Sequence, residues 1–163
     1  MHEISRNFKL VTVWLLIGLG LFLAAQWWLA HQQRSQFSSS GGAVELKRAS
    51  DGHFHWPGRV NGVAVDFLVD TGATSTALPL ALAQRAKLAT EGALRSETAG
   101  GVVRGQIARA DVALDGGVRA SNLRVTVLPN LSAPLLGMDI LSKMRFTQHD
   151  GVLRFEPSTG AAN

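Results

Sequence analysis

The chain of 163 residues contains no cysteine and no tyrosine, and aromatic residues make up only 7% of it. Without cysteine, the protein can form no disulfide scaffold, no thiolate zinc site, no thiol nucleophile and no iron–sulfur cluster. The same absence leaves the cellular compartment open, because a cysteine-free chain tolerates oxidising and reducing conditions equally. Several classes of protein are therefore excluded before any motif is considered.

Charged residues are also scarce, at 17% of the chain against a usual value of about 25%. Lys and Arg outnumber Asp and Glu by 16 to 12, which gives a formal net charge of +4. From residue 43 onward there are 13 basic and 11 acidic residues, so this part carries only +2. The arginines are scattered and are not interleaved with aromatic residues. This pattern favours a solvated mixed surface and argues against nucleic acid as a partner.

One segment accounts for the apolar bias of the composition. Residues 10–30 form a run of 21 residues without a charge, with tryptophans near both ends. As a helix rising about 1.5 Å per residue, this run spans roughly the 30 Å of a bilayer core. Arg6 and Lys9 precede it, so the positive-inside rule predicts a cytoplasmic N-terminus and an exported domain. The lipid bilayer is therefore an expected partner of 10–30.

A cleaved signal peptide is the competing interpretation of this segment. Its apolar core usually runs for about 7–15 residues and ends at a small-x-small site. Cleavage after Ala30 would place Trp28 where a small residue is required, and Ala25 with Leu23 makes a weaker site. A buried helix of a soluble protein would need partner helices that this chain lacks. An uncleaved single-pass anchor is the favoured interpretation, and both leading alternatives export the domain.

Composition divides the rest of the chain. Residues 32–40 are rich in Ser and Gln, which is typical of a flexible linker. The expected organisation is a cytoplasmic stub at 1–9, a transmembrane helix at 10–30, a flexible linker at 31–50, a folded domain at 51–157 and a tail at 158–163.

The folded part has mostly two-residue periodicity, which indicates β-strands. Two expected strands, 54–60 and 63–69, flank Asn61-Gly62, a strong signal for a type I′ hairpin. A second hairpin is expected around Asp115-Gly116-Gly117. Good helix formers after a proline predict one short helix at 79–88. A second short helix is expected after Gly137, and 152–155 is expected to form the last strand. The expected fold class is all-β: a small closed barrel or sandwich with one or two short helices, preceded by one transmembrane helix.

The strand 63–69 leads directly into Asp70-Thr71-Gly72-Ala73. A buried carboxylate at the end of an apolar strand is costly unless it is paired or hydrogen-bonded. Thr71 offers a hydroxyl, and Gly72 permits a tight turn whose backbone N–H groups can face the carboxylate. Taken alone, this motif fits a carboxylate that caps a turn.

A second motif, Leu135-Leu136-Gly137, follows about 65 residues later. The two motifs together resemble the retropepsin-like aspartic proteases, and more closely the bacterial membrane-anchored proteins of that kind. The resemblance covers nearly all of the exported part. It implies that Asp70 is catalytic, that Thr71 grips the backbone of a partner subunit, and that Gly72 and Ala73 shape the active-site loop. It also implies that Leu135, Leu136 and Gly137 pack beneath that loop.

The resemblance further assigns a flap to the segment near Gly100 and Gly101, where such proteases carry a hairpin over the substrate. An ordinary glycine-tipped hairpin is the alternative. Pepsin-like relatives use a flap tyrosine, which this chain does not contain. The retroviral style of site is therefore favoured.

The number of catalytic carboxylates determines the expected assembly. Aspartic peptidases use two carboxylates that share a proton and act on a water molecule. This chain has one Asp-Thr-Gly motif in a domain of half the required size, so a homodimer with Asp70 from each subunit is expected. The function expected is hydrolysis of peptide bonds in the bacterial periplasm by an inner-membrane endopeptidase without cofactor or metal. The alternative is a catalytically silent, membrane-tethered dimeric domain that binds a peptide or protein.

Other interpretations carry less weight. Asp70, Gly72 and Thr74 also match the phosphate loop of large two-domain kinases, for which this chain is too short. His53 and His55 could bind a metal, but no third ligand has convincing spacing, so exposed strand histidines are favoured. Two acids outside the first motif have structural interpretations: Asp66 as an exposed edge residue, and Asp139 as the N-cap of the short helix.

Overall fold

The computed structural model describes residues 6–32, 36–39, 42–98 and 101–157. The chain divides into two compact units, Met1–Arg34 and Ser35–Asn163. The expected tail at 158–163 lies outside the described residues, as does residue 100 of the expected flap.

The first unit is a helix, α1, which runs over Arg6–Gln32. Within it, Leu10–Trp28 has a mean hydropathy of 2.0 and none of its residues is buried. Trp14 and Leu15 are 70% and 68% exposed. Such a surface is compatible with a membrane span or a signal sequence, and its lack of burial argues against the core helix of a soluble protein.

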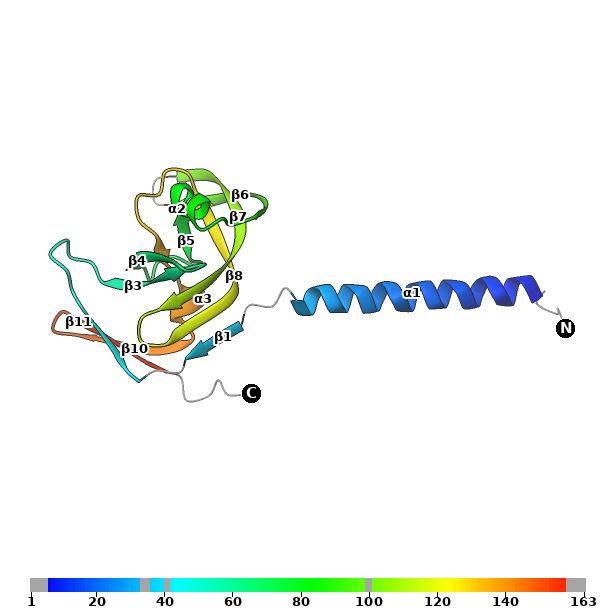
Figure 1. The fold of residues 1–163 in the computed structure, drawn as a ribbon, viewed down its shortest axis with the longest axis horizontal. Helices are drawn as coiled ribbons and strands as arrows, with labels where there is room; N and C mark the ends of the chain where they lie inside the picture. Colours follow the sequence, from blue (N-terminus) through cyan, green and yellow to red (C-terminus); the bar gives the residue numbers. More distant parts are fainter. Residues whose placement is uncertain (1–5, 33–35, 40–41, 99–100, 158–163) are drawn as a thin grey trace. The chain divides into compact units, whose positions relative to one another are not determined.

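The second unit is built on a closed β-barrel (Figure 1). Six strands follow one another in the order β8-β5-β9-β4-β3-β7, and the pairing of β7 with β8 closes the ring. Strand β1 extends it beside β8, and β6 extends it beside β7. The expected all-β class with a closed barrel is confirmed. The strands of this sheet are β1 (Gln36–Ser39), β3 (His55–Val60), β4 (Val63–Val69), β5 (Ala77–Pro79), β6 (Thr90–Thr98), β7 (Gly101–Leu114), β8 (Val118–Leu128) and β9 (Leu135–Leu136).

A smaller sheet packs against the barrel. It has the order β10-β11-β2, with bounds Met144–His149, Val152–Pro157 and Val44–Lys47. The ring of Phe155 on β11 lies 4.6 Å, centroid to centroid, from the ring of Trp56 on β3, and both side chains are almost fully buried. This aromatic pair joins the two sheets into one hydrophobic core.

Both expected hairpins form where the turn residues predicted them. Asn61 and Gly62 have φ values of +46° and +82°, which a type I′ turn requires at both central positions. Gly116 and Gly117 also adopt positive φ, at +97° and +88°. These two turns set the register of β3 with β4 and of β7 with β8.

The structure differs from expectation in the range 31–50. Strands β1 and β2 lie inside this range, which composition assigned to a flexible linker. The reason is a pairing that composition cannot reveal: Val44–Lys47 joins β11, more than 100 residues away, and this buries Leu46.

The helix expected at 79–88 is also shorter than predicted. Helix α2 spans Leu80–Arg85, and Pro79 occupies its N-cap position rather than its first turn. Lys87 takes a φ of +52°, a left-handed conformation that ends the helix. The second expected helix is α3, a single turn over Met138–Leu141.

Candidate active site

Asp70 stands at the carboxyl end of β4, where two backbone contacts fix it. Strand β4 pairs in parallel with β9, so that Val69 lies opposite Leu136. The Asp70 N–H donates to the carbonyl oxygen of Leu136 at 3.1 Å, and the Asp70 carbonyl accepts from the Ala73 N–H at 3.2 Å. The first contact continues the strand pairing, and the second closes a turn. The half-buried Asp70 side chain is thus presented on a loop held by the barrel.

The carboxylate of Asp70 is held by its own loop. The Gly72 N–H donates to Oδ1 of Asp70 at 2.9 Å. A Cβ atom at Gly72 would lie 3.2 Å from this same oxygen, so the glycine permits the close approach. Among the described residues, no other carboxylate pairs or shares a hydrogen bond with Asp70. The Thr71 side chain is exposed.

The predicted under-loop element lies beside the loop. Leu136 is fully buried, and the Met138 N–H donates to the carbonyl oxygen of Ala73 at 2.8 Å. A Cβ atom at Gly137 would come within 2.5 Å of the Ser75 carbonyl carbon and 2.8 Å of the Thr76 nitrogen. Only glycine allows this contact between two backbones. The Leu135-Leu136-Gly137 element and the Asp70 loop are therefore packed against each other.

Thr76 and Asp139 join this loop to α3. The sequence offers no signal for Thr76 and suggests a different role for Asp139. The expectation that Asp139 caps the helix is wrong: Gly137 is the N-cap, and Asp139 lies inside the first turn. Its Oδ2 accepts the Thr76 N–H and its Oδ1 accepts the Thr76 hydroxyl, each at 2.8 Å. Thr76 is fully buried and also accepts the Gly137 N–H at 3.3 Å. No local pattern signals this contact, because the residues are 63 positions apart.

The expected flap corresponds to the hairpin of β6 and β7. Thr98 pairs with Gly101, which leaves a two-residue connection between the strands. Gly101 has a φ of +104°, a conformation that glycine adopts without strain. Gly100 lies outside the described residues. Val102, next to the connection, is 55% exposed.

His55 on β3, Asp66 on β4 and Asp51 in the loop before β3 form a separate cluster. The His55 ring lies between two carboxylates, with Nε2 2.8 Å from Asp51 and Nδ1 3.0 Å from Asp66. The hydrogen bond with Asp51 is the main cause of a raised His55 pKa, and burial partly opposes it. Asp66 is exposed, as expected, but β4 is not an edge strand, because it lies between β3 and β9 in the barrel. Within the described ranges, no three His, Cys, Asp or Glu side chains form a group that could hold a metal ion.

Comparison with known proteins identifies the family of this chain. The family model described as "gag-polyprotein putative aspartyl protease" matches residues 56–143, which include Asp70 and most of the barrel. A search among curated protein sequences found no match.

A solved structure has the same fold. The chain is similar to a retropepsin-like aspartic protease from Rickettsia conorii, with 26% identity and a TM-score of 0.56. The similarity covers 75% of this chain and 96% of that one. It is also similar to the EIAV protease complexed with the inhibitor HBY-793, with 24% identity, a TM-score of 0.49, and coverage of 54% and 84%. Because the family model spans more than half of the sequence, the chain belongs to the gag-polyprotein aspartyl protease family, among the retropepsin-like aspartic proteases.

Proposed function

We propose that this protein is a membrane-anchored aspartic endopeptidase that is active as a homodimer, with Asp70 from each subunit forming the catalytic pair. The observation that carries the proposal is the setting of Asp70. Its Oδ1 accepts the Gly72 N–H at 2.9 Å, and no second carboxylate from the described residues of the same chain joins it. Because the reaction needs two carboxylates, the second has to come from another copy.

The chemistry follows from two carboxyl groups that share one proton. The ionised Asp70 takes a proton from a water molecule, and the water oxygen attacks the carbonyl carbon of the scissile peptide bond. The protonated Asp70 of the other subunit donates a hydrogen bond to the carbonyl oxygen. Collapse of the tetrahedral intermediate breaks the C–N bond, and the leaving nitrogen receives the proton that the first Asp70 took from the water molecule. The pair titrates as a unit, and activity is expected to favour acidic to near-neutral pH.

The loop geometry supports roles for Gly72 and Gly137, and the family supplies those proposed for Thr71 and the hairpin tip. Gly72 orients Asp70 through its N–H, and the element ending at Gly137 supports the loop from below. In the dimer, the Thr71 hydroxyl binds the backbone of the partner subunit. The hairpin tip at Gly100 and Gly101 covers the bound peptide.

We place the protein in the bacterial inner membrane with its N-terminus in the cytoplasm and its domain in the periplasm. The apolar segment Leu10–Trp28, of which no residue is buried, supports a membrane span. The basic residues that precede it support this orientation. Confinement to the membrane also raises the effective concentration of subunits, which favours dimerisation.

The test of catalysis uses the full chain in detergent micelles with an unfolded protein as substrate, between pH 4 and 7. We expect cleavage by the native chain, and no cleavage by Asp70→Asn. Asp66→Asn is the matched control, because it removes a carboxylate from the same strand and should keep most of the activity. Equal cleavage by the native chain and Asp70→Asn contradicts the proposal. Binding of the substrate without cleavage favours a catalytically silent binding domain instead.

The shared site is tested by mixing. When equal amounts of native and Asp70→Asn chains exchange subunits, about one quarter of the dimers keep two intact aspartates. Activity should fall to about that fraction of an all-native sample, because mixed dimers lack one carboxylate. A fall to only about one half would mean that each chain works alone and would contradict the shared site.

A further inference from the structure

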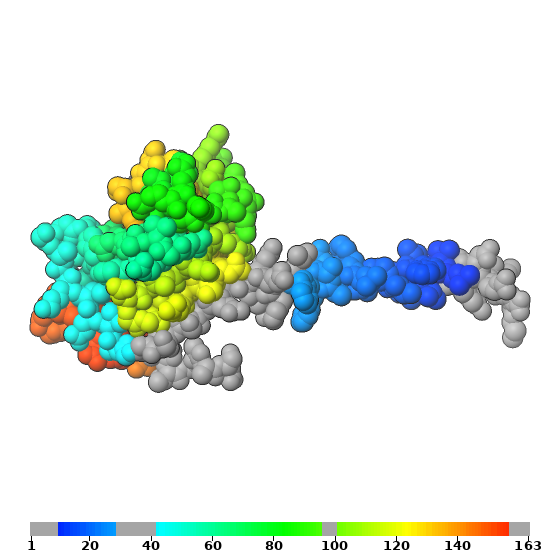
Figure 2. All heavy atoms as spheres, viewed as in Figure 1, coloured from blue at the N-terminus to red at the C-terminus, as the bar shows by residue number. Residues whose placement is uncertain are grey.

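A pocket of about 400 Å³ opens on the surface of the domain. It lies between α2, the first half of β4 and the segment that leads into β9. These three segments, green, blue-green and orange, lie next to one another in the space-filling view (Figure 2). None of its lining residues belongs to 70–73, so the pocket is not part of the candidate active site.

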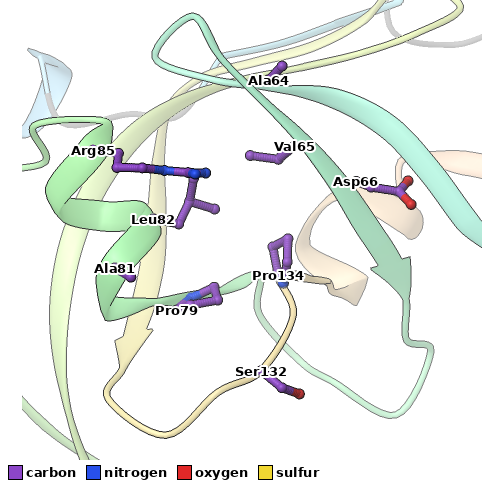
Figure 3. A pocket seen from close by; sticks show the side chains of 9 residues that line it. All are labelled: Ala64, Val65, Asp66, Pro79, Ala81, Leu82, Arg85, Ser132 and Pro134. Carbon is purple, nitrogen blue, oxygen red and sulfur yellow. The ribbon is translucent and has the colours of Figure 1, made fainter.

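The pocket is lined by both apolar and polar side chains, and the fold holds its walls in place. Its apolar part is formed chiefly by Val65, Pro79, Leu82 and Pro134 (Figure 3). Leu82 is only 5% exposed, so it anchors α2 in the core. The Pro134 carbonyl accepts the Leu68 N–H at 2.8 Å, which ties one wall to β4. A cavity built this way is largely formed before a ligand arrives.

Arg85 supplies a cation beside the apolar part of this pocket. It ends α2, and its side chain extends over Leu82 toward Val65 (Figure 3). Among the described residues, no carboxylate lies within ion-pair distance of Arg85. Asp66 also lines the pocket, but its carboxylate turns away in Figure 3 and pairs with Nδ1 of His55 at 3.0 Å. The guanidinium is therefore free to bind an anion.

We propose that this pocket binds a small apolar group that carries a carboxylate, as at the C-terminal end of a peptide with an apolar last residue. The carboxylate accepts two parallel hydrogen bonds from Arg85, for which the planar guanidinium is suited. The apolar group fills the space between Val65, Leu82 and Pro134. A short fatty acid shares this chemistry, so the experiment compares both sources.

The pocket is connected to the strand that carries Asp70. Leu68, whose N–H binds Pro134, stands two residues before Asp70. The amide signal of Leu68 should therefore report whether the pocket is occupied, in addition to the amide signals of the residues that line it. The proposal itself concerns binding and does not depend on peptide hydrolysis.

The experiment is an NMR titration of the full ¹⁵N-labelled chain in detergent micelles. N-acetyl-L-leucine is the peptide-end probe, and hexanoate is the fatty-acid probe. We expect N-acetyl-L-leucine to shift the amide signals of Val65, Leu82 and Arg85. N-acetyl-L-leucinamide, which lacks the carboxylate, and acetate, which lacks the apolar group, should each bind at least about tenfold more weakly. Binding of hexanoate as well would extend the site to any apolar carboxylate, whereas its failure would restrict the site to peptide ends.

Two variants test the assigned residues. Arg85→Gln should lower the affinity for N-acetyl-L-leucine about tenfold. Arg145 is an exposed arginine on β10, and Arg145→Gln should leave this affinity unchanged. Ala64→Leu adds bulk at the pocket wall and should weaken binding without removing charge. The proposal is overturned if the amide probe binds as well as the acid, or if Arg85→Gln binds as well as the native chain. Because no substrate is cleaved in this titration, an inactive protein tests it equally well.

Discussion

Asp139 accepts two hydrogen bonds from Thr76, one from its backbone N–H and one from its hydroxyl, each at 2.8 Å. Thr76 is fully buried, six residues after Asp70, and Asp139 lies two residues after the glycine that packs beneath the loop. This carboxylate therefore joins the loop that carries Asp70 to helix α3. Two predictions concern this junction.

Removal of the Asp139 carboxylate should destabilise the domain. Asp139→Ala leaves two buried donors of Thr76 without an acceptor, and each costs about 1–3 kcal/mol. We expect a loss of about 2–6 kcal/mol in the free energy of unfolding, measured by urea denaturation of the full chain in micelles. Asp139→Asn keeps one oxygen acceptor and should lose less. Asp115→Ala, an exposed acid in a turn, is the control, and an equal loss in this variant would contradict the assigned role.

A methyl group at Gly137 should also disrupt the junction. Its Cβ would meet the backbone of Ser75 and Thr76 at 2.5–2.8 Å, and neither backbone can move without displacing the Asp70 loop. We expect Gly137→Ala to cost about 1–3 kcal/mol or more, as overpacking in a core does, and to lower peptidase activity. Gly92→Ala has nothing within 4 Å of the added Cβ and serves as the matched control. Similar melting temperatures for the two variants would refute the close contact.

The environment of His55 predicts a pH dependence. Its pKa is raised from 6.5, chiefly by the hydrogen bond with Asp51, with smaller contributions from Asp66. Because the protonated ring gains these interactions on folding, their stabilising effect is complete below pH 6.5 and is lost as the pH rises through the raised pKa. The pKa of Asp51 is lowered, first by the His53 N–H and then by His55, so its effect is lost only when the pH falls below 3.8 toward that lower value.

NMR titration of the histidine ring signals measures this directly. Asp51→Asn should lower the His55 pKa more than Asp66→Asn does, since the hydrogen bond with Asp51 is the largest cause. His149 at the end of β10 is the internal reference, because its carboxylate partner is Asp150 and neither substitution touches it. A larger decrease of the His55 pKa in Asp66→Asn than in Asp51→Asn would contradict the assignment of Asp51 as the main cause.

Thr71 offers a test of the dimer that is separate from catalysis. Its side chain is exposed in the single chain, and in the proposed dimer it binds the partner's backbone. Thr71→Ala removes two equivalent hydrogen bonds of about 1 kcal/mol each, which should raise the dimer dissociation constant about tenfold or more. Analytical ultracentrifugation in micelles measures the constant. Thr74→Ala, at another exposed threonine, is the control. An unchanged dissociation constant for Thr71→Ala would contradict the proposed hydrogen bond between Thr71 and the partner's backbone.

Several features of this protein are already determined by local sequence. The absence of charge from 10–30 predicts an apolar helix, and Leu10–Trp28 is one. Asn61-Gly62 predicts a type I′ turn, because few other residue pairs accept positive φ at both positions, and the observed angles agree. The two-residue periodicity that follows predicts a β domain with Asp70 at the end of a strand. Each of these depends on residues within a few positions of one another.

Other features depend on the closed barrel and could not be predicted from neighbours along the chain. Strand β2 finds its partner in β11, so a range with linker composition becomes part of the fold. Asp139 meets Thr76 only because β4 and β9 run in parallel, which brings α3 against the Asp70 loop. The pocket at Arg85 likewise exists only where α2, β4 and the segment before β9 converge. Sequence determined which residues form strands and turns, because those preferences are local. Only the tertiary structure decided which distant polar groups meet, because that depends on strand register and barrel closure.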